Sequence, residues 1–332
     1  MASTARFDVV AIGNAIVDVL ARADDALIEA EGLTKGSMRL IDADEAERLY
    51  AAMGPAIEMS GGSAANTLAG MAALGRRCGF IGQVAGDQLG QVFTHDLTSL
   101  GIAFDTPPLQ DGAPTARCLV LVTPDGQRTM NTFLGASQDL GRESLDAALI
   151  ADADILYLEG YLWNAEASRA AMAEAIGLAR AAGRRVAFTL SDTFVIAAHG
   201  ADFRRMIAAR EIDILFANEA ELLELAQEGD FETALARVAP DVPLLVVTRS
   251  EKGAVALADG TRTEVAAEPI DDVVDTTGAG DLFAAGFLAG LAEQRPMADC
   301  LTMGAVCAGE IIAQVGPRAQ TDLKAKVAER LG

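Results

Sequence analysis

The residues best placed to do chemistry form a loop near the C-terminal end, Asp275-Thr276-Thr277-Gly278-Ala279-Gly280-Asp281, followed by an apolar, small-residue run. Glycines let bare backbone approach a ligand closely, and the run predicts a helix whose first N–H groups lack partners within the helix. Those amides, at the positive end of the helix dipole, suit an anionic group such as phosphate. We therefore expect Gly278, Ala279 and Gly280 to contact a phosphoryl group.

Asp281 closes this loop and needs its own explanation, because a carboxylate beside a phosphate site repels phosphate. One interpretation is a general base that takes a proton from a hydroxyl group about to attack phosphorus. The other is an ordinary helix cap, since Asp is a common residue at that position. The loop alone leaves both interpretations open.

The elements that must position this loop alternate between strand-like and helix-like segments. Apolar runs typical of buried strands cover residues 7–13, 79–84, 155–158, 185–190, 212–217 and 244–248. Helix-like segments cover residues 62–74, 89–100, 165–182 and much of 281–314, with two short helices between 217 and 244. Near-continuous apolar strands separated by helices predict an α/β fold, with a doubly wound, mainly parallel sheet flanked by helices.

One region breaks this alternation. Residues 102–136 lack a helical period and carry turn signals at Pro107-Pro108, Asp111-Gly112 and Pro124-Asp125-Gly126. Extended runs at 117–122 and 128–133 predict a β-hairpin or small antiparallel sheet, to which residues 36–41 could add a strand. We interpret this β region, formed by inserted segments at about 14–42 and 102–136, as a lid over the active site. A contact between subunits is the alternative.

Two motifs near the N-terminus have residues suited to a small ligand. Asn14 and Asp18 follow the first strand, where ligands of such sheets bind, although both types also form turns. Gly61-Gly62 opens a helix, and Asn66 offers both a donor and an acceptor. Close packing of that helix on the sheet is the alternative explanation for the two glycines.

Two further motifs follow buried strands in the C-terminal half. Asn218 and Glu221, three residues apart at a helix start, suit a Mg²⁺ ion that keeps most of its waters and bridges phosphates. An acidic first helical turn is also common without a metal. Thr248, Ser250 and Gly253 leave the next strand and could lie against a nucleotide phosphate. No Gly-x-x-x-x-Gly-Lys-Ser/Thr sequence occurs, which excludes a P-loop enzyme.

The net charge of −22 over 332 residues argues against nucleic acid and anionic membrane as partners. It also means that a nucleotide must be attracted by backbone amides, a few cations and a metal ion. No apolar run reaches the ~18 residues of a membrane span, and no secretory segment precedes the first strand. The four cysteines are scattered without a Cys-x-x-Cys pair, as in a reduced, cytoplasmic protein.

Taken together, these motifs resemble the ribokinase-like (PfkB) family of carbohydrate and nucleoside kinases across essentially the whole chain. The resemblance implies a single kinase domain that uses ATP, Mg²⁺ and, in some members, a monovalent cation such as K⁺, for which Asp275 is the candidate ligand. It implies that Asp281 is the base and that Arg128 on the lid reaches the transferred phosphoryl group. It also implies that Asp18, Gly62 and Asn66 hold substrate hydroxyls, and that the protein is a monomer or a homodimer.

Within the family, the chain looks most like the adenosine kinase subgroup. The candidate pocket wall is apolar, as a purine requires, and its members are Ile16, Met38, Leu40, Phe133, Leu134, Tyr161 and Leu162. The expected reaction is phosphorylation of adenosine to AMP. A sugar kinase (ribokinase, fructokinase or 2-keto-3-deoxygluconate kinase) is the alternative, and a non-catalytic regulator is a third.

Overall fold

The computed structural model describes residues 5–270, 272–314 and 316–332, and its largest element is an eight-stranded sheet in the order β13-β12-β11-β10-β9-β8-β1-β5. The strands from β5 to β11 pair in parallel, whereas β12 and β13 are antiparallel at one edge. Their bounds are β1 Phe7–Ile12, β5 Cys78–Ile81, β8 Ala153–Glu159, β9 Arg185–Thr189, β10 Ile214–Asn218, β11 Leu244–Thr248, β12 Ala254–Ala258 and β13 Thr261–Val265.

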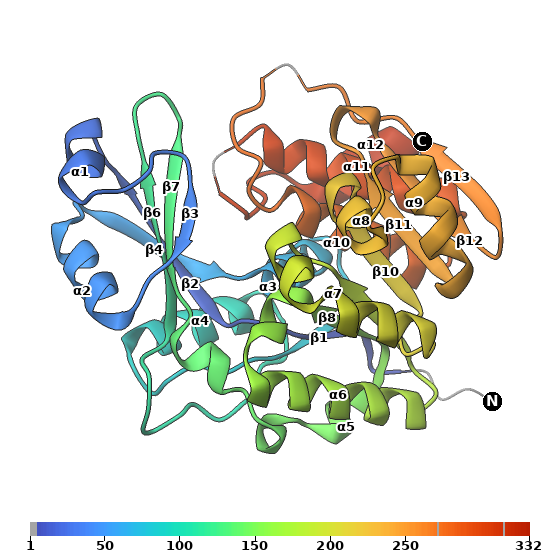
Figure 1. Cartoon of the computed structure of the whole chain (residues 1–332), viewed down its shortest axis with the longest axis horizontal. Coiled ribbons are helices and arrows are strands. Elements are labelled where there is room, and N and C mark those ends of the chain that lie inside the picture. Colours follow the sequence, from blue (N-terminus) through green and yellow to red (C-terminus); the bar gives the residue numbers. More distant parts are fainter. Residues whose placement is uncertain (1–4, 271, 315) are drawn as a thin grey trace.

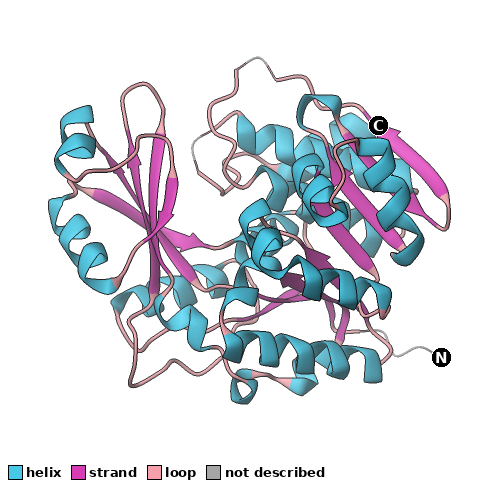
Figure 2. Ribbon diagram, in the orientation of Figure 1, coloured by secondary structure: helices cyan, strands magenta, loops and turns pink. Residues whose placement is uncertain are grey.

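Helices cover both faces of this sheet, so its central strands are buried on both sides (Figures 1 and 2). One face packs on α3 (Ser63–Ala73), α10 (Ala279–Ala292) and α11 (Met297–Ile312), with α4 (Gln88–Ser99) and α12 (Leu323–Leu331) joining the same core. The other face packs on α5 (Ala147–Ala151), α6 (Glu166–Ala181), α7 (Thr193–Ala208), α8 (Glu219–Ala226) and α9 (Phe231–Val238). The predicted doubly wound, mainly parallel α/β fold is confirmed.

A second sheet of five strands stands apart from the first, in the order β3-β7-β6-β2-β4 (Figure 1). Its strands are β2 (Ile16–Arg22), β3 (Met38–Leu40), β4 (Ala56–Gly61), β6 (Ala116–Val122) and β7 (Arg128–Phe133). The β6–β7 hairpin is antiparallel, while β3 joins β7 and β2 joins β6 in parallel. The short helices α1 (Asp25–Ala30) and α2 (Ala43–Ala52) lie between its strands in the chain.

Several elements of the structure are not among those predicted from the sequence. Residues 16–22 form a full strand, although their Asn and Asp neighbours suggest a turn. Strand β4 is a half-exposed edge without an apolar run, and it lies outside both predicted lid segments. Helix α7 begins with β-branched residues and contains Gly200, which lowers its intrinsic helix propensity. No helix within the described ranges is long and apolar enough to cross a bilayer.

Helix α10, which carries Asp281 in its first turn, is buried between α3 and α11. Glycines allow the close approach to α11. A Cβ at Gly286 would collide with the carbonyl oxygen of Met303, and one at Gly304 would lie 2.9 Å from that of Phe283. The position of Asp281 therefore depends on backbone-to-backbone packing.

We expect Gly286→Ala to lower the free energy of unfolding by about 1–3 kcal/mol, because the added methyl group must push the two helices apart. Gly177→Ala is the matched control, since this exposed glycine of α6 has open space around its Cβ position and should gain ~0.5–1 kcal/mol. Urea denaturation of both variants measures the difference. An unchanged midpoint for Gly286→Ala would show that the α10–α11 contact is loose.

Candidate active site

The glycine-rich loop before α10 has the geometry of an anion site. Gly278 is the N-cap of α10 and has a φ of 79°, a left-handed conformation that favours glycine. The amide of Ala279 donates to the Thr276 carbonyl at 3.2 Å, so it is already engaged within the loop. Gly278 and Gly280 both line a cavity of about 490 Å³, and Ala279 does not. This weakens the expectation that all three amides contact a phosphoryl group and favours the two glycines.

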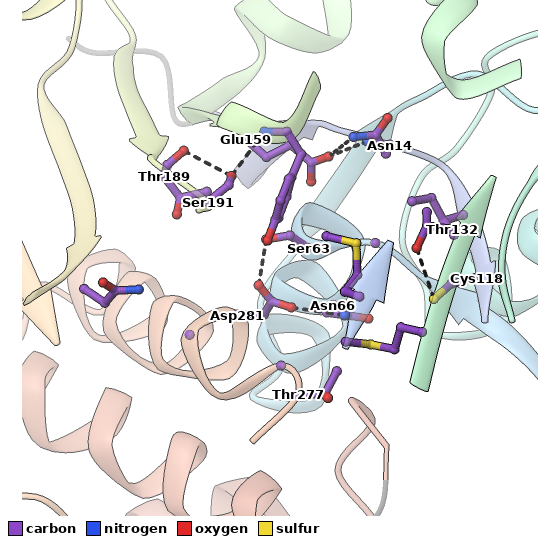
Figure 3. Close-up of a pocket in the computed structure, with 18 of the residues that line it drawn as sticks. Asn14, Ser63, Asn66, Cys118, Thr132, Glu159, Thr189, Ser191, Thr277 and Asp281 are labelled. Atoms are coloured by element: carbon purple, nitrogen blue, oxygen red, sulfur yellow. Dashed lines mark hydrogen bonds between the residues drawn. The ribbon is translucent and has the colours of Figure 1, made fainter. Parts of the chain in front are cut away.

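Asp281 reaches the same cavity from α10 and is held by α3. The Ser63 hydroxyl donates to its Oδ1 at 2.6 Å, and the Asn66 amide donates to its Oδ2 at 3.1 Å (Figure 3). Burial raises the pKa of Asp281, while these two hydrogen bonds and the charge of Arg318 lower it. The carboxylate caps no amide of its own helix; its partners are side chains of another helix, which argues against the capping interpretation.

Arg318 is a member of this cluster that the sequence does not single out. Its guanidinium donates to the Asn66 Oδ1 at 2.7 Å and to the carbonyl oxygen and hydroxyl of Ser60 at 2.7 and 2.9 Å. It follows α11 in a short segment without a recognisable motif, so only the three-dimensional structure brings it to the site. Asn66 thus has both ends of its amide engaged, by Arg318 and by Asp281.

Asp18 lies on β2 of the smaller sheet and faces the cavity. Burial raises the pKa of Asp18 to about 6, with the charges of Arg318 and Arg128 opposing the increase and that of Asp281 adding to it. Gly61 of the neighbouring strand β4 pairs with Ile16 of β2, and a side chain at Gly61 would collide with the Asp18 carboxylate. Gly61 therefore makes room for Asp18 and does not line the cavity, whereas Gly62 does.

Asn14 is fixed by Glu159, a second residue that the sequence does not single out. The Glu159 Oε1 accepts hydrogen bonds from the backbone and side-chain amides of Asn14, both at 2.7 Å, and Oε2 accepts one from the Ala64 amide at 2.8 Å (Figure 3). The Asn14 Oδ1 accepts a hydrogen bond from Ser137. Burial raises the pKa of Glu159 to about 7. This carboxylate joins the end of β1 to the start of α3.

Arg128 joins the smaller sheet to the glycine-rich loop. Its Nη1 lies 2.8 Å from the Asp275 Oδ2, and both side chains are largely buried. Asp275 also accepts hydrogen bonds from the amides of Thr277 and Gly316, at 3.0 and 3.1 Å. Both carboxylate oxygens are therefore engaged, so a role of Asp275 as a K⁺ ligand stays a prediction. Arg128 does not line the cavity, but its Nη2 is buried without a partner among the described residues.

Part of the cavity lining is apolar and aromatic. Ile16, Met38, Leu40, Leu134, Tyr161 and Phe194 line it, and the rings of Tyr161 and Phe194 lie 6.0 Å apart. Phe133 and Leu162 do not line it, contrary to the sequence-based expectation; Leu162 is part of the hydrophobic core. Side chains alternate along a strand, so Met130 and Thr132 of β7 face the cavity while Phe133 packs on the opposite side near Arg117. Phe194 was hidden from the sequence because α7 itself was not predicted.

A second cavity of about 590 Å³ meets the first at the start of α10. The two share Thr248, Thr276, Gly280 and Phe283. Ser250 and Gly253, predicted from the sequence to bind nucleotide, line the second cavity, together with an apolar group formed by Ala267, Pro269, Ile270, Val273, Ala305, Ala308 and Ile312. Two ligands could therefore meet end to end beside Asp281.

Asn218 and Glu221 line the first cavity, and Asn218 pairs in the sheet with Thr248, which lines both cavities. They form a capping box at the start of α8, with the Asn218 side chain bonded to the Glu221 amide and the Glu221 carboxylate bonded to Asn218. Burial raises the pKa of Glu221 to about 7, and within the described ranges the residue forms no ion pair. Its carboxylate lines the first cavity without a neutralising charge, an environment that suits a cation.

Comparison with known proteins identifies the class of this protein as a phosphotransferase. Residues 8–324 match the pfkB family of carbohydrate kinases, and the chain belongs to that family. It is thus a sugar or nucleoside kinase, and the family implies the use of ATP, typically with Mg²⁺.

Individual relatives point to more than one substrate. A solved adenosine kinase from Sinorhizobium meliloti is 46% identical, with a TM-score of 0.91, over 98% of this chain and 99% of that one. A solved probable sugar kinase from Rhizobium etli CFN 42 has the same identity and TM-score, over 98% of both chains. The fructokinase of Salmonella typhimurium is 31% identical over 76% of this chain and 86% of its own length.

Proposed function

We propose that this protein is an ATP-dependent adenosine kinase that phosphorylates the 5′-hydroxyl group of adenosine. The observation that carries the proposal is the mixed lining of the first cavity, which combines the polar side chains of Asp281, Asp18 and Asn14 with an apolar, aromatic wall. A ribose can bind the polar groups through its hydroxyls, and a purine base can pack on the wall. The similarity to the adenosine kinase of Sinorhizobium meliloti supports the same substrate.

The charges around the cavity favour a neutral substrate. Its lining includes the carboxylates of Asp18, Glu159, Glu221 and Asp281, and no Lys or Arg in the described part of the chain. An acid sugar or a sugar phosphate would enter this field with no cation at the wall to receive it. We therefore disfavour the keto-deoxy acid alternative and keep a neutral sugar, such as ribose or fructose, as the second candidate.

In the proposed reaction, Asp281 takes the proton from the 5′-hydroxyl group as its oxygen bonds to the γ-phosphorus. The bond from that phosphorus to the bridging oxygen breaks, and ADP leaves with the bonding electrons. The amides of Gly278 and Gly280, with the α10 dipole, stabilise the negative charge that develops on the phosphoryl oxygens. Arg128 lies on the smaller sheet and is paired with Asp275 of this loop, and its unpartnered Nη2 is the candidate donor to the same charge.

The second cavity is the proposed site of ATP. Its apolar group of residues suits an adenine ring, and Thr248, Ser250 and Gly253 line the same cavity with the start of α10. Asn218 and Glu221 would hold Mg²⁺ through its waters, because both Glu221 oxygens already accept hydrogen bonds from Asn218. Mg²⁺, when bound, supplies positive charge to the phosphate chain.

We expect Glu221→Gln to move the Mg²⁺ dependence of turnover to higher concentration while the KM for adenosine changes little. The substitution removes the charge that attracts the ion, but Gln can keep the capping box, so the helix should stay intact. Initial rates over a Mg²⁺ series at saturating ATP measure the effect. An unchanged Mg²⁺ titration would leave Asn218 and Glu221 with a purely structural role at the helix start.

We expect kcat/KM for adenosine to be much higher than for free ribose or fructose. Burying an aromatic-sized group contributes roughly 1.5–3 kcal/mol, so the base should be worth about a factor of 10 to 100 in affinity. An ATP-consumption screen over nucleosides and simple sugars measures the ratio. Equal or better efficiency on a free sugar would exclude the adenosine assignment, and no turnover on any acceptor would favour the regulatory alternative.

The wall itself can be tested by substitution. Tyr161→Ser and Met38→Ser should reduce kcat/KM for adenosine more than any residual activity on ribose, because only the nucleoside has a base to place there. Tyr50→Ser is a matched control on the smaller sheet's helix α2, since Tyr50 is 42% exposed and bonds to Glu58 outside the cavity. It should leave both activities unchanged.

A further inference from the structure

Arg318 is half-buried in the active-site cluster, although no carboxylate forms a direct ion pair with it among the described residues. Burial lowers the pKa of its guanidinium, and the charges of Asp18, Asp281 and Asp96 raise it. Withdrawing a charge from water is costly unless its donors are satisfied and opposite charges lie nearby. Its donors bind Asn66 and Ser60, and one of these, Asn66, binds Asp281.

We propose that Arg318 is a positioning residue for phosphoryl transfer: it fixes the amide of Asn66 so that the amide nitrogen, and not the oxygen, faces Asp281. The proposal rests on the role of Asp281 as the base. Arg318 touches neither cavity's reacting atoms and acts through Asn66.

The donors and acceptors around Asn66 determine the orientation of its side-chain amide. A guanidinium group has only donors, so the atom of Asn66 that lies 2.7 Å from Arg318 must be the amide oxygen. The amide nitrogen then faces the Asp281 Oδ2, at 3.1 Å, where an ionised carboxylate can only accept. Without Arg318 the amide could rotate, and its oxygen would repel the carboxylate.

The segment that carries Arg318 is fixed at three points. The Gly316 amide donates to Asp275 at the start of the glycine-rich loop, and a Cβ at Gly278 would lie 3.0 Å from the Pro317 Cβ. Arg318 itself bonds to the carbonyl oxygen and hydroxyl of Ser60 at the end of β4. The guanidinium therefore cannot shift without disturbing the anion site or the smaller sheet, as a positioning role requires.

The charge of Arg318 acts on the pKa of Asp281, and a pH profile of kcat can measure this effect. The hydrogen bonds from Ser63 and Asn66 and the charge of Arg318 lower the pKa of Asp281 against the effect of burial. The other titratable side chains that interact electrostatically with Asp281 are Asp18, Glu159, Tyr157 and Tyr161. None of these is cationic, so loss of Arg318 removes a cation whose field lowers the pKa of Asp281.

The test is a pH profile of kcat for Arg318→Met and Arg318→Lys beside the unaltered enzyme, with ATP and the best acceptor found. For Arg318→Met we expect kcat to fall by ~10–100-fold, the scale of a misplaced reacting group, with the KM for ATP unchanged. Its acid limb should move to higher pH by ~1 unit, because removing an opposite charge raises the pKa of the base. Arg318→Lys keeps the positive charge but lacks the two-pronged donor geometry of the guanidinium group. The acid limb of its pH profile should therefore match that of the unaltered enzyme, whereas kcat should be only partly recovered relative to Arg318→Met.

Two further variants separate positioning from folding. Arg184→Met removes a largely buried guanidinium that bonds to Ala151, far from both cavities, and should change stability without moving the pH profile. The double variant Asn66→Ala/Arg318→Lys should have the same kcat as Asn66→Ala alone, because Arg318 positions Asp281 through Asn66 and this contact is already lost in Asn66→Ala. If Arg318→Met does not fold, the comparison can still be made with Arg318→Lys.

A wild-type pH profile and kcat in folded Arg318→Met, or additive losses in the double variant, would overturn the inference. These results are distinct from a failure of the proposed chemistry. If Asp281→Asn is inactive while the Arg318 variants are normal, only the role of Arg318 is wrong. If Asp281→Asn is active, the base assignment on which this inference rests is wrong.

Discussion

The candidate active site is organised around one electrostatic constraint: the carboxylate of Asp281 is half-buried beside the backbone amides that we propose bind a phosphoryl group. Burial favours the protonated form of an acid, whereas a general base must be ionised. The protein opposes burial with the Ser63 hydroxyl, the Asn66 amide and the charge of Arg318. The glycine packing of α10 against α11 places the carboxylate, and α3 supplies its partners.

The same constraint explains why the site takes its cations from distant parts of the chain. In a protein with a net charge of −22, four carboxylates line the first cavity, and no Lys or Arg of the described residues does. Arg128 of β7 and Arg318 of the segment after α11 carry positive charge close to Asp18, and they are engaged by Asp275 and by Asn66, respectively. Both lie outside the lining of the first cavity, an arrangement that fits the neutral acceptor we propose.

The sequence was sufficient for the parts of the site that depend on local backbone. Gly278 and Gly280 before an apolar run, and Gly62 before α3, are signals of close approach, and all three line the first cavity. The alternation of buried strands and helices likewise predicted the main sheet. Phe133 was wrongly placed in the pocket because the register of β7, which decides the face of each side chain, is set by pairing with β6.

The sequence was insufficient where a residue acts through long-range contact. Glu159, Phe194 and Arg318 belong to no motif: Glu159 ends an apolar strand, Phe194 begins a helix of weak propensity, and Arg318 follows a glycine and a proline. Their roles arise because the ends of β8, α7 and the C-terminal segment meet around α3 and α10. Such long-range contacts depend on the topology of the fold, and they leave no local pattern in the amino-acid sequence.

The most direct test of the proposed chemistry is the turnover of Asp281→Asn. This substitution keeps the size of the side chain but removes the base, so kcat at saturating adenosine and ATP should fall by at least ~10²-fold. Calorimetric titration should show adenosine binding close to that of the unaltered enzyme, because Asp18, Gly62 and the apolar wall are intact. Near-normal turnover of a correctly folded Asp281→Asn variant would contradict the assignment of Asp281 as the general base.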